Sequence, residues 1–173
     1  QKKDISINNY YFNKKGLKFY ESYYRLKSNK LPLIDAKIAL SKDNFTKNKK
    51  NRWITNKKSR KLSHLLRTKY NALLSTSKTI NEDNSILNCR INGLGNKSPN
   101  LIILDRNLNI RKNLKIFKLK TKRKIFIYTT NNNKNKINWF KRKNIKVFIM
   151  KKMSSKDDFT KLFKSFIKLN FSR

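Results

Sequence analysis

Short, unbroken apolar runs separated by polar segments constrain the fold of this chain most strongly. A strand with one face in water alternates apolar and polar residues, whereas a strand buried on both faces reads as a continuous apolar run. We expect strands of the second kind over five segments: 33–39, 71–75, 101–105, 125–128 and 145–149. Such strands, alternating with helices, predict an α/β fold whose mostly parallel sheet carries helices on both faces.

Helical patterns occupy several intervals between these runs. Thr55 is expected to cap a helix over about 56–68. Further helices are expected near 134–142 and over 159–167, where apolar residues recur at helical spacing. The apolar stripe of the helix at 56–68 consists of Leu62, Leu65 and Leu66.

Residues 1–30 interleave tyrosines with lysines. We expect a helix over about 16–26 that packs its aromatic side chains on the body of the protein. The alternative is a stacking surface for single-stranded nucleic acid, which combines the same two residue types.

Two stretches carry chemically distinctive residues at fixed spacing. Residues 51–90 contain, in order, Trp53-Ile54-Thr55, His64-Leu65-Leu66-Arg67, Thr79, Asp83, Leu87 and Arg90. The stretch upstream of them reads Lys37-Ile38-Ala39-Leu40-Ser41-Lys42-Asp43-Asn44. Together they resemble the reductase domain of the riboflavin-biosynthesis deaminase/reductase family, with its W-I-T, H-x-L-R, T-x-x-x-D, L-x-x-R and K-x-A-x-S-L-D-G patterns.

This resemblance implies a dihydrofolate-reductase-like fold and an NADPH-dependent oxidoreductase. The family reduces the ribosyl group of 5-amino-6-(5-phosphoribosylamino)uracil, a phosphorylated aminopyrimidine nucleotide, to a ribityl chain. Ligands of an open parallel sheet bind beyond the carboxyl ends of its strands, so we expect the matched residues to gather there.

The resemblance also implies a role for each matched position. The catalytic residues would be Lys37 and Asp83. The cofactor-binding residues would be Ala39, Leu40, Trp53, Thr79, Asp83 and Arg106. The substrate-binding residues would be Asn51, Arg67, Leu87 and Arg90. Arginine suits a substrate phosphate because its planar fork donates two parallel, charge-assisted hydrogen bonds. No metal ligand is implied.

Three positions depart from the family pattern. Asn51 stands where a serine contacts substrate, and Arg106 stands where a serine meets the cofactor. We expect Arg106 to contact the 2′-phosphate of NADPH instead. Asn44 replaces a turn glycine, and asparagine tolerates the left-handed conformation that such a turn requires.

Each matched residue also has an ordinary structural alternative. Trp53 suits a core or helix-start position, and Arg67 could complement the dipole at the end of its helix. Asp83 could cap the following turn. We expect His64, the one histidine of the chain, to serve in packing or hydrogen bonding.

The resemblance covers nearly all of this chain but only part of a reductase domain. We expect 1–30 to be an interdomain linker with a helix and 31–173 to be a partial reductase domain that lacks its C-terminal strands. The family's zinc deaminase domain would precede residue 1, and one cysteine with one histidine cannot build its zinc site here. The family implies a homodimer. Gln1 at the start suggests a fragment or a processed chain.

Charge is the other feature that requires an explanation, because the net charge is +36. The excess of lysine reflects either a compositional bias or a polyanionic partner such as RNA. The second case would make this chain a non-enzymatic RNA- or ribosome-associated protein on a degenerate reductase scaffold. The sequence has no apolar run near the length of a membrane span and a single cysteine, Cys89, so a cytoplasmic location is expected.

Overall fold

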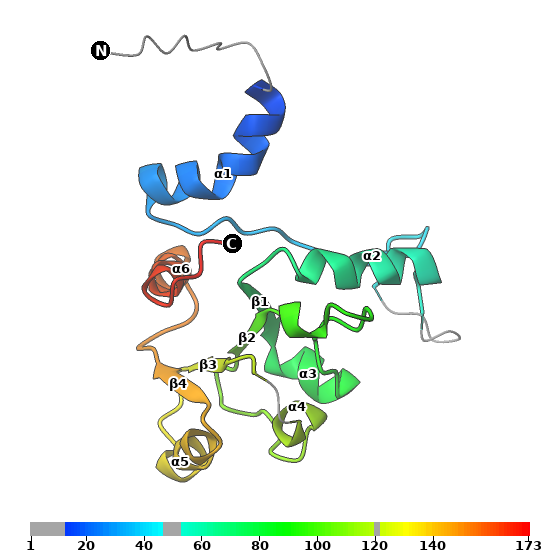
Figure 1. Cartoon of the computed structure of the whole chain (residues 1–173). Helices are drawn as coiled ribbons and strands as arrows, with labels where there is room; N and C mark the ends of the chain where they lie inside the picture. The colour runs from blue at the N-terminus through cyan, green and yellow to red at the C-terminus, as the bar shows by residue number, and fades with distance from the viewer. Residues whose placement is uncertain (1–12, 47–52, 120–121) are drawn as a thin grey trace.

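The structure, a computed structural model, describes residues 13–46, 53–119 and 122–173 (Figure 1). Within these residues the helices are α1 (Asn13–Asn29), α2 (Lys57–Arg67), α3 (Ser77–Asp83), α4 (Lys115–Lys118), α5 (Lys134–Arg142) and α6 (Lys156–Lys168), with a 3₁₀ turn at Gly95–Lys97. The strands are β1 (Ala72–Thr76), β2 (Asn100–Leu104), β3 (Ile125–Thr129) and β4 (Lys146–Ile149).

The four strands form one sheet in the order β1-β2-β3-β4, and each neighbouring pair is parallel. Every residue of β3 is buried, as its continuous apolar run predicts. Four of the five predicted strands are thus confirmed, together with the α/β class and the parallel arrangement.

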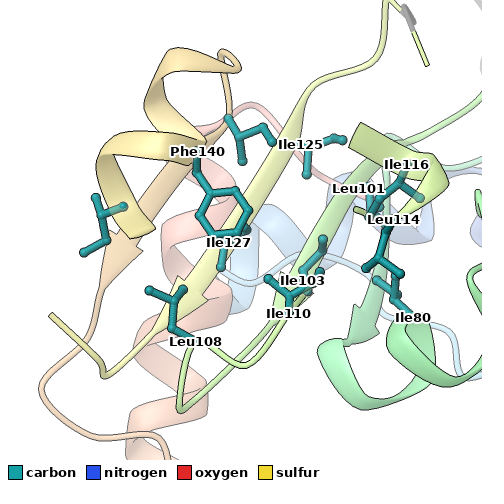
Figure 2. Packing of buried hydrophobic residues seen from close by; sticks show 12 residues of the cluster. Ile80, Leu101, Ile103, Leu108, Ile110, Leu114, Ile116, Ile125, Ile127 and Phe140 are labelled. Carbon is teal, nitrogen blue, oxygen red and sulfur yellow. The ribbon is translucent and has the colours of Figure 1, made fainter. Parts of the chain in front are cut away.

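Helices cover both faces of the sheet. On one face, Ile103 of β2 and Ile127 of β3 belong to a buried cluster that also contains Ile80 of α3 and Phe140 of α5. Figure 2 shows this cluster, with Phe140 beside Ile127. The other face forms a second cluster that joins the strands to α6: Ile102, Phe126, Tyr128, Met153, Leu162, Phe166 and Phe171. The two clusters confirm the prediction of a sheet covered on both sides.

The predicted strand over 33–39 is wrong. This segment has no regular secondary structure and pairs with no strand among the described residues. Its first backbone donor, the Leu33 N–H, hydrogen bonds to the Ser172 carbonyl at 2.9 Å. The Asn71 N–H, just before β1, bonds to the Arg173 carbonyl at 2.8 Å. Residues 172–173 therefore lie between this segment and β1, so the segment has no neighbouring strand with which to form a ladder.

Helix α2 confirms the predicted helix but not its cap. Asn56, not Thr55, is the N-cap, because its side-chain oxygen accepts the Ser59 N–H at 2.8 Å. The apolar stripe does not enter the core, since α2 has no buried residue and Leu62 is 56% exposed. Amphipathic spacing predicted the helix correctly, but it does not say whether the apolar face finds a partner.

Helix α1 likewise confirms the predicted helix and corrects its packing. It extends away from the sheet (Figure 1), and Phe19 is 74% exposed. The tyrosines Tyr20, Tyr23 and Tyr24 are also exposed and contact one another edge to face. No helix of the described residues has the length and apolar character needed to cross a bilayer.

Candidate functional site

Two arginines hold three consecutive backbone carbonyls of the loop that follows α3. The guanidinium of Arg123 donates to the carbonyls of Ile86 and Leu87, the latter at 2.9 Å. That of Arg67 donates to the next carbonyl, of Asn88, at 2.6 Å. Two residues that the resemblance places at the substrate, Arg67 and Leu87, thus meet at one loop backbone, which Arg123 also holds. The sequence did not single out Arg123.

His64 links Arg67 to Arg90 within the same group. Its Nδ1 lies 3.1 Å from the Asn88 carbonyl oxygen, and its Nε2 lies 3.3 Å from the Nε of Arg90. A tautomer protonated on Nδ1 satisfies these two contacts, because Nδ1 then donates to the carbonyl and Nε2 accepts from Arg90. The Arg90 backbone N–H also lies 3.3 Å from Nδ1, and only the other tautomer would accept it. This agrees with the expected hydrogen-bonding role of His64. We call His64, Arg67, Arg90 and Arg123 the arginine cluster.

The positive charges of the arginine cluster repel one another. Burial, followed by repulsion from Arg67, lowers the pKa of Arg123 to about 10. Burial and the charge of Arg90 also lower the pKa of Arg67. The pKa of His64 is lowered by burial first, then by Arg67 and Arg90, so its imidazole is neutral at pH 7. None of the charged groups that shift these pKa values is a carboxylate, so a bound anion would relieve the repulsion.

The residues matched to the cofactor lie on a different element. Thr79 and Asp83 belong to α3, which begins directly after β1, and both are exposed. Thr76 caps this helix by accepting the Thr79 N–H at 3.3 Å. Asp83 ends the helix four residues before Leu87, so α3 and the following loop connect the cofactor positions to the arginine cluster.

Only part of the matched set gathers at the carboxyl ends of the strands. Thr79 and Asp83 follow β1, and Arg106 follows β2, as expected. The arginine cluster is built instead from residues that precede strands, because Arg67 precedes β1 and Arg123 precedes β3.

A buried carboxylate orders the turn after β2. Asp105 accepts hydrogen bonds at 2.8 Å from the Ser77 hydroxyl and from the backbone N–H groups of Asn109 and Ile110. The neighbouring Arg106 is exposed, and its guanidinium donates to the Met153 carbonyl. Ser77 and Asp105 were missed as a pair, although a carboxylate directly after an apolar strand was a signal for such a turn.

Trp53 is a surface residue, 53% exposed, so its core alternative is wrong. The guanidinium of Arg60 lies over its ring at 4.5 Å from the centroid. The indole therefore lies against the Arg60 side chain of the first turn of α2.

The upstream stretch is not joined to the arginine cluster. Lys37 and Leu40 are exposed and Ala39 is half-buried, and we find no hydrogen bond from them to the cluster within the described residues. Asn44 has φ +64°, which confirms the predicted left-handed turn. Asn51 lies outside the described residues.

Two surface hollows accompany these features. One, of about 470 Å³, lies where strands begin and is lined by residues that include Lys122, Lys124, Lys146 and Lys168. The other, of about 620 Å³, lies beside α5. In the described part of the chain, no three His, Cys, Asp or Glu side chains gather closely enough to hold a metal ion.

This chain is similar in sequence to one protein family and in fold to several solved structures. Residues 32–166 match the family described as the RibD C-terminal domain. A deaminase/5-amino-6-(5-phosphoribosylamino)uracil reductase from Thermotoga maritima has a similar structure, with a TM-score of 0.73 and 19% identity over 93% of this chain and 43% of that one. RibD from Acinetobacter baumannii gives a TM-score of 0.70 and 18% identity over 89% of this chain and 41% of that one.

At these identities, the two solved structures establish the fold alone, and this chain spans less than half the length of either protein. A search among curated protein sequences found no match. The family match extends over most of the chain and includes both of its distinctive stretches, the four strands and the arginine cluster. The chain therefore belongs to the RibD C-terminal domain family, a family of reductase domains in riboflavin biosynthesis.

Proposed function

We propose that this chain is the reductase portion of a RibD-type enzyme. It binds 5-amino-6-(5-phosphoribosylamino)uracil and NADPH and reduces the ribosyl group to the ribityl form. The observation that carries this proposal is the arginine cluster, which contains Arg67 and Arg90 of the family pattern and hydrogen bonds to the loop that carries Leu87.

The arginine cluster supplies what a substrate phosphate requires. Arg90 is exposed and offers its guanidinium to a ligand, while Arg67 adds a second, half-buried positive charge. Neutral His64 accepts the Nε–H of Arg90 and so directs the remaining N–H groups of that guanidinium. A phosphate dianion would accept these donors and lower the mutual repulsion of the cations.

The residues matched to the cofactor have suitable chemistry for NADPH. An exposed carboxylate at Asp83 can accept from ribose hydroxyls or the nicotinamide amide, and the Thr79 hydroxyl can donate or accept. Arg106 and Trp53 offer a cation and a ring face, with Ala39 or Leu40 against the cofactor. NADPH supplies the hydride, and the protein binds and orients the two ligands. Lys37 would polarise the pyrimidine carbonyl.

The test is oxidation of NADPH that depends on the phosphorylated aminouracil substrate. We expect Asp83→Ala to weaken NADPH binding by about tenfold or more, the loss of one charge-assisted hydrogen bond or more, with the fold retained. Asp157→Ala is the matched control, because Asp157 is an exposed carboxylate on α6. Equal NADPH affinity in wild type and a folded Asp83→Ala variant would remove Asp83 from the site.

A second function, binding to a polyanion such as RNA, is favoured by one specific observation. Helix α1 exposes Phe19, Tyr20, Tyr23 and Tyr24, and the ammonium of Lys27 lies 5.7 Å from the Tyr23 ring centroid. Exposed rings beside lysines can stack on bases while the net charge of +36 attracts phosphates. RNA affinity that falls steeply with salt, and is lost in Tyr20→Ser/Tyr24→Ser, would support this function.

A further inference from the structure

Arg123 engages the backbone of the substrate-side loop at two successive peptide groups. Its Nη1 donates to the Leu87 carbonyl and its Nη2 to the Ile86 carbonyl. These two carbonyls flank the Cα of Leu87. The planar fork of a guanidinium can hold both at once, whereas a lysine ammonium on its flexible stem has no such fixed geometry.

The backbone between these carbonyls is strained. Leu87 has φ +56°, a left-handed conformation that brings its Cβ too close to the backbone. A branched apolar residue keeps this conformation only where its surroundings impose it. The Leu87 side chain packs against the core cluster, and Arg123 fixes the carbonyls on either side.

The hydrogen bonds of Arg123 to this loop come with unfavourable burial of the guanidinium. Arg123 is largely buried, its pKa is lowered by burial and by Arg67, and its Nε–H is buried without an acceptor in the described structure. A buried donor left without a partner is unfavourable. The arrangement instead fixes the segment that carries Leu87 and, three residues later, Arg90.

We propose that Arg123 is a positioning residue for the phosphate site, holding residues 86–88 so that Leu87 and Arg90 face the phosphorylated substrate. This role rests on the proposed function. Arg123 acts through the loop backbone, and Arg67 completes the same arrangement at the third carbonyl.

The experiment measures binding of ribose 5-phosphate to the whole 173-residue chain by calorimetry. We compare wild type with Arg123→Met, Arg123→Lys, Arg67→Ala and the charge control Arg142→Met, an exposed arginine of α5. Arg123→Met should weaken binding by about tenfold and speed amide hydrogen exchange at residues 86–90. NADPH affinity should not change in this variant, which separates the loop from general damage to the fold.

Arg123→Lys distinguishes the two hydrogen bonds to the loop backbone from the effect of positive charge alone. Lysine keeps the positive charge but not the fork, so we expect a loss close to that of Arg123→Met. Full wild-type affinity in Arg123→Lys would overturn the positioning role of the guanidinium. This variant carries the test if Arg123→Met does not fold.

The remaining outcomes separate this role from the proposed function. Unchanged affinity in Arg123→Met, with binding lost in Arg67→Ala, would overturn the role of Arg123 and leave the phosphate site standing. No binding by wild type would overturn the phosphate site and, with it, this role.

Discussion

At the scale of single residues, His64 is the most informative group in the molecule. It hydrogen bonds to the loop carbonyl of Asn88 and to Arg90, and it shares the arginine cluster with Arg67. The sequence placed it on a helix and predicted a hydrogen-bonding role. Its partners could not be foreseen, because the loop they belong to lies more than 20 residues further along the chain.

The lowered pKa of His64 makes stability depend on pH. Its folded-state pKa lies below 6.5, so the unfolded chain binds a proton more readily than the folded chain. The stabilising contribution is therefore complete well above pH 6.5, begins to fall as the unfolded imidazole titrates, and is lost as pH falls through the folded pKa. Wild type should lose stability between about pH 7.5 and 5.5, whereas His64→Gln should lose less, as measured by denaturant unfolding. Parallel pH profiles for the two proteins would contradict this coupling.

At the scale of elements, the apolar pattern predicted whether a segment is a helix or a strand. It did not predict which elements lie beside it. Runs at β1, β2, β3 and β4 became strands because each lies beside another run. The segment at 33–39 is also largely apolar, although it contains Asp35 and Lys37, and it has no strand beside it among the described residues. Pairing is a property of the whole sheet, so a single segment cannot reveal it.

The candidate site shows the same limit of sequence-based prediction, because contacts between distant segments are not visible in the sequence. The sequence placed Thr79 and Asp83 after the strand expected over 71–75, and the structure has them after β1, which is that strand. It did not find Arg123, which stands 33 residues beyond Arg90 and whose neighbours in the sequence are lysines. Only the fold brings its guanidinium to the carbonyls of Ile86 and Leu87.

The N-caps of α2 and α6 allow a prediction, because α6 packs in the core and α2 does not. Ser155 and Asp158 form a reciprocal capping box on α6, which buries Leu162 and Phe166. Ser155→Ala should lower the free energy of unfolding by about 1 kcal/mol. Asn56→Ala removes the cap of α2, which has no buried residue, so it should speed hydrogen exchange within α2 and change global stability less. Equal global losses in the two variants would show that α2 unfolds only with the core.

At the scale of the whole molecule, charge repulsion opposes folding. With 45 lysines and arginines against 9 acidic residues, the compact state concentrates positive charge. Salt screens this repulsion over a Debye length of roughly 10 Å at 0.1 M. The melting temperature should therefore rise between about 0.02 and 0.3 M sodium chloride. A melting temperature that falls over this range would mean that attractive charge contacts dominate the fold.

The central claim is that the arginine cluster is a phosphate site, and the single histidine of the chain tests it most directly. We would follow the His64 imidazole by NMR through a pH titration with sulfate, a dianion that does not titrate in this range, or with chloride at equal ionic strength. Bound sulfate should raise the pKa of His64 above its value in chloride, because it neutralises Arg67 and Arg90. Arg67→Ala should remove this rise. The same pKa in sulfate and chloride, at saturating sulfate, would contradict an anion site at the arginine cluster.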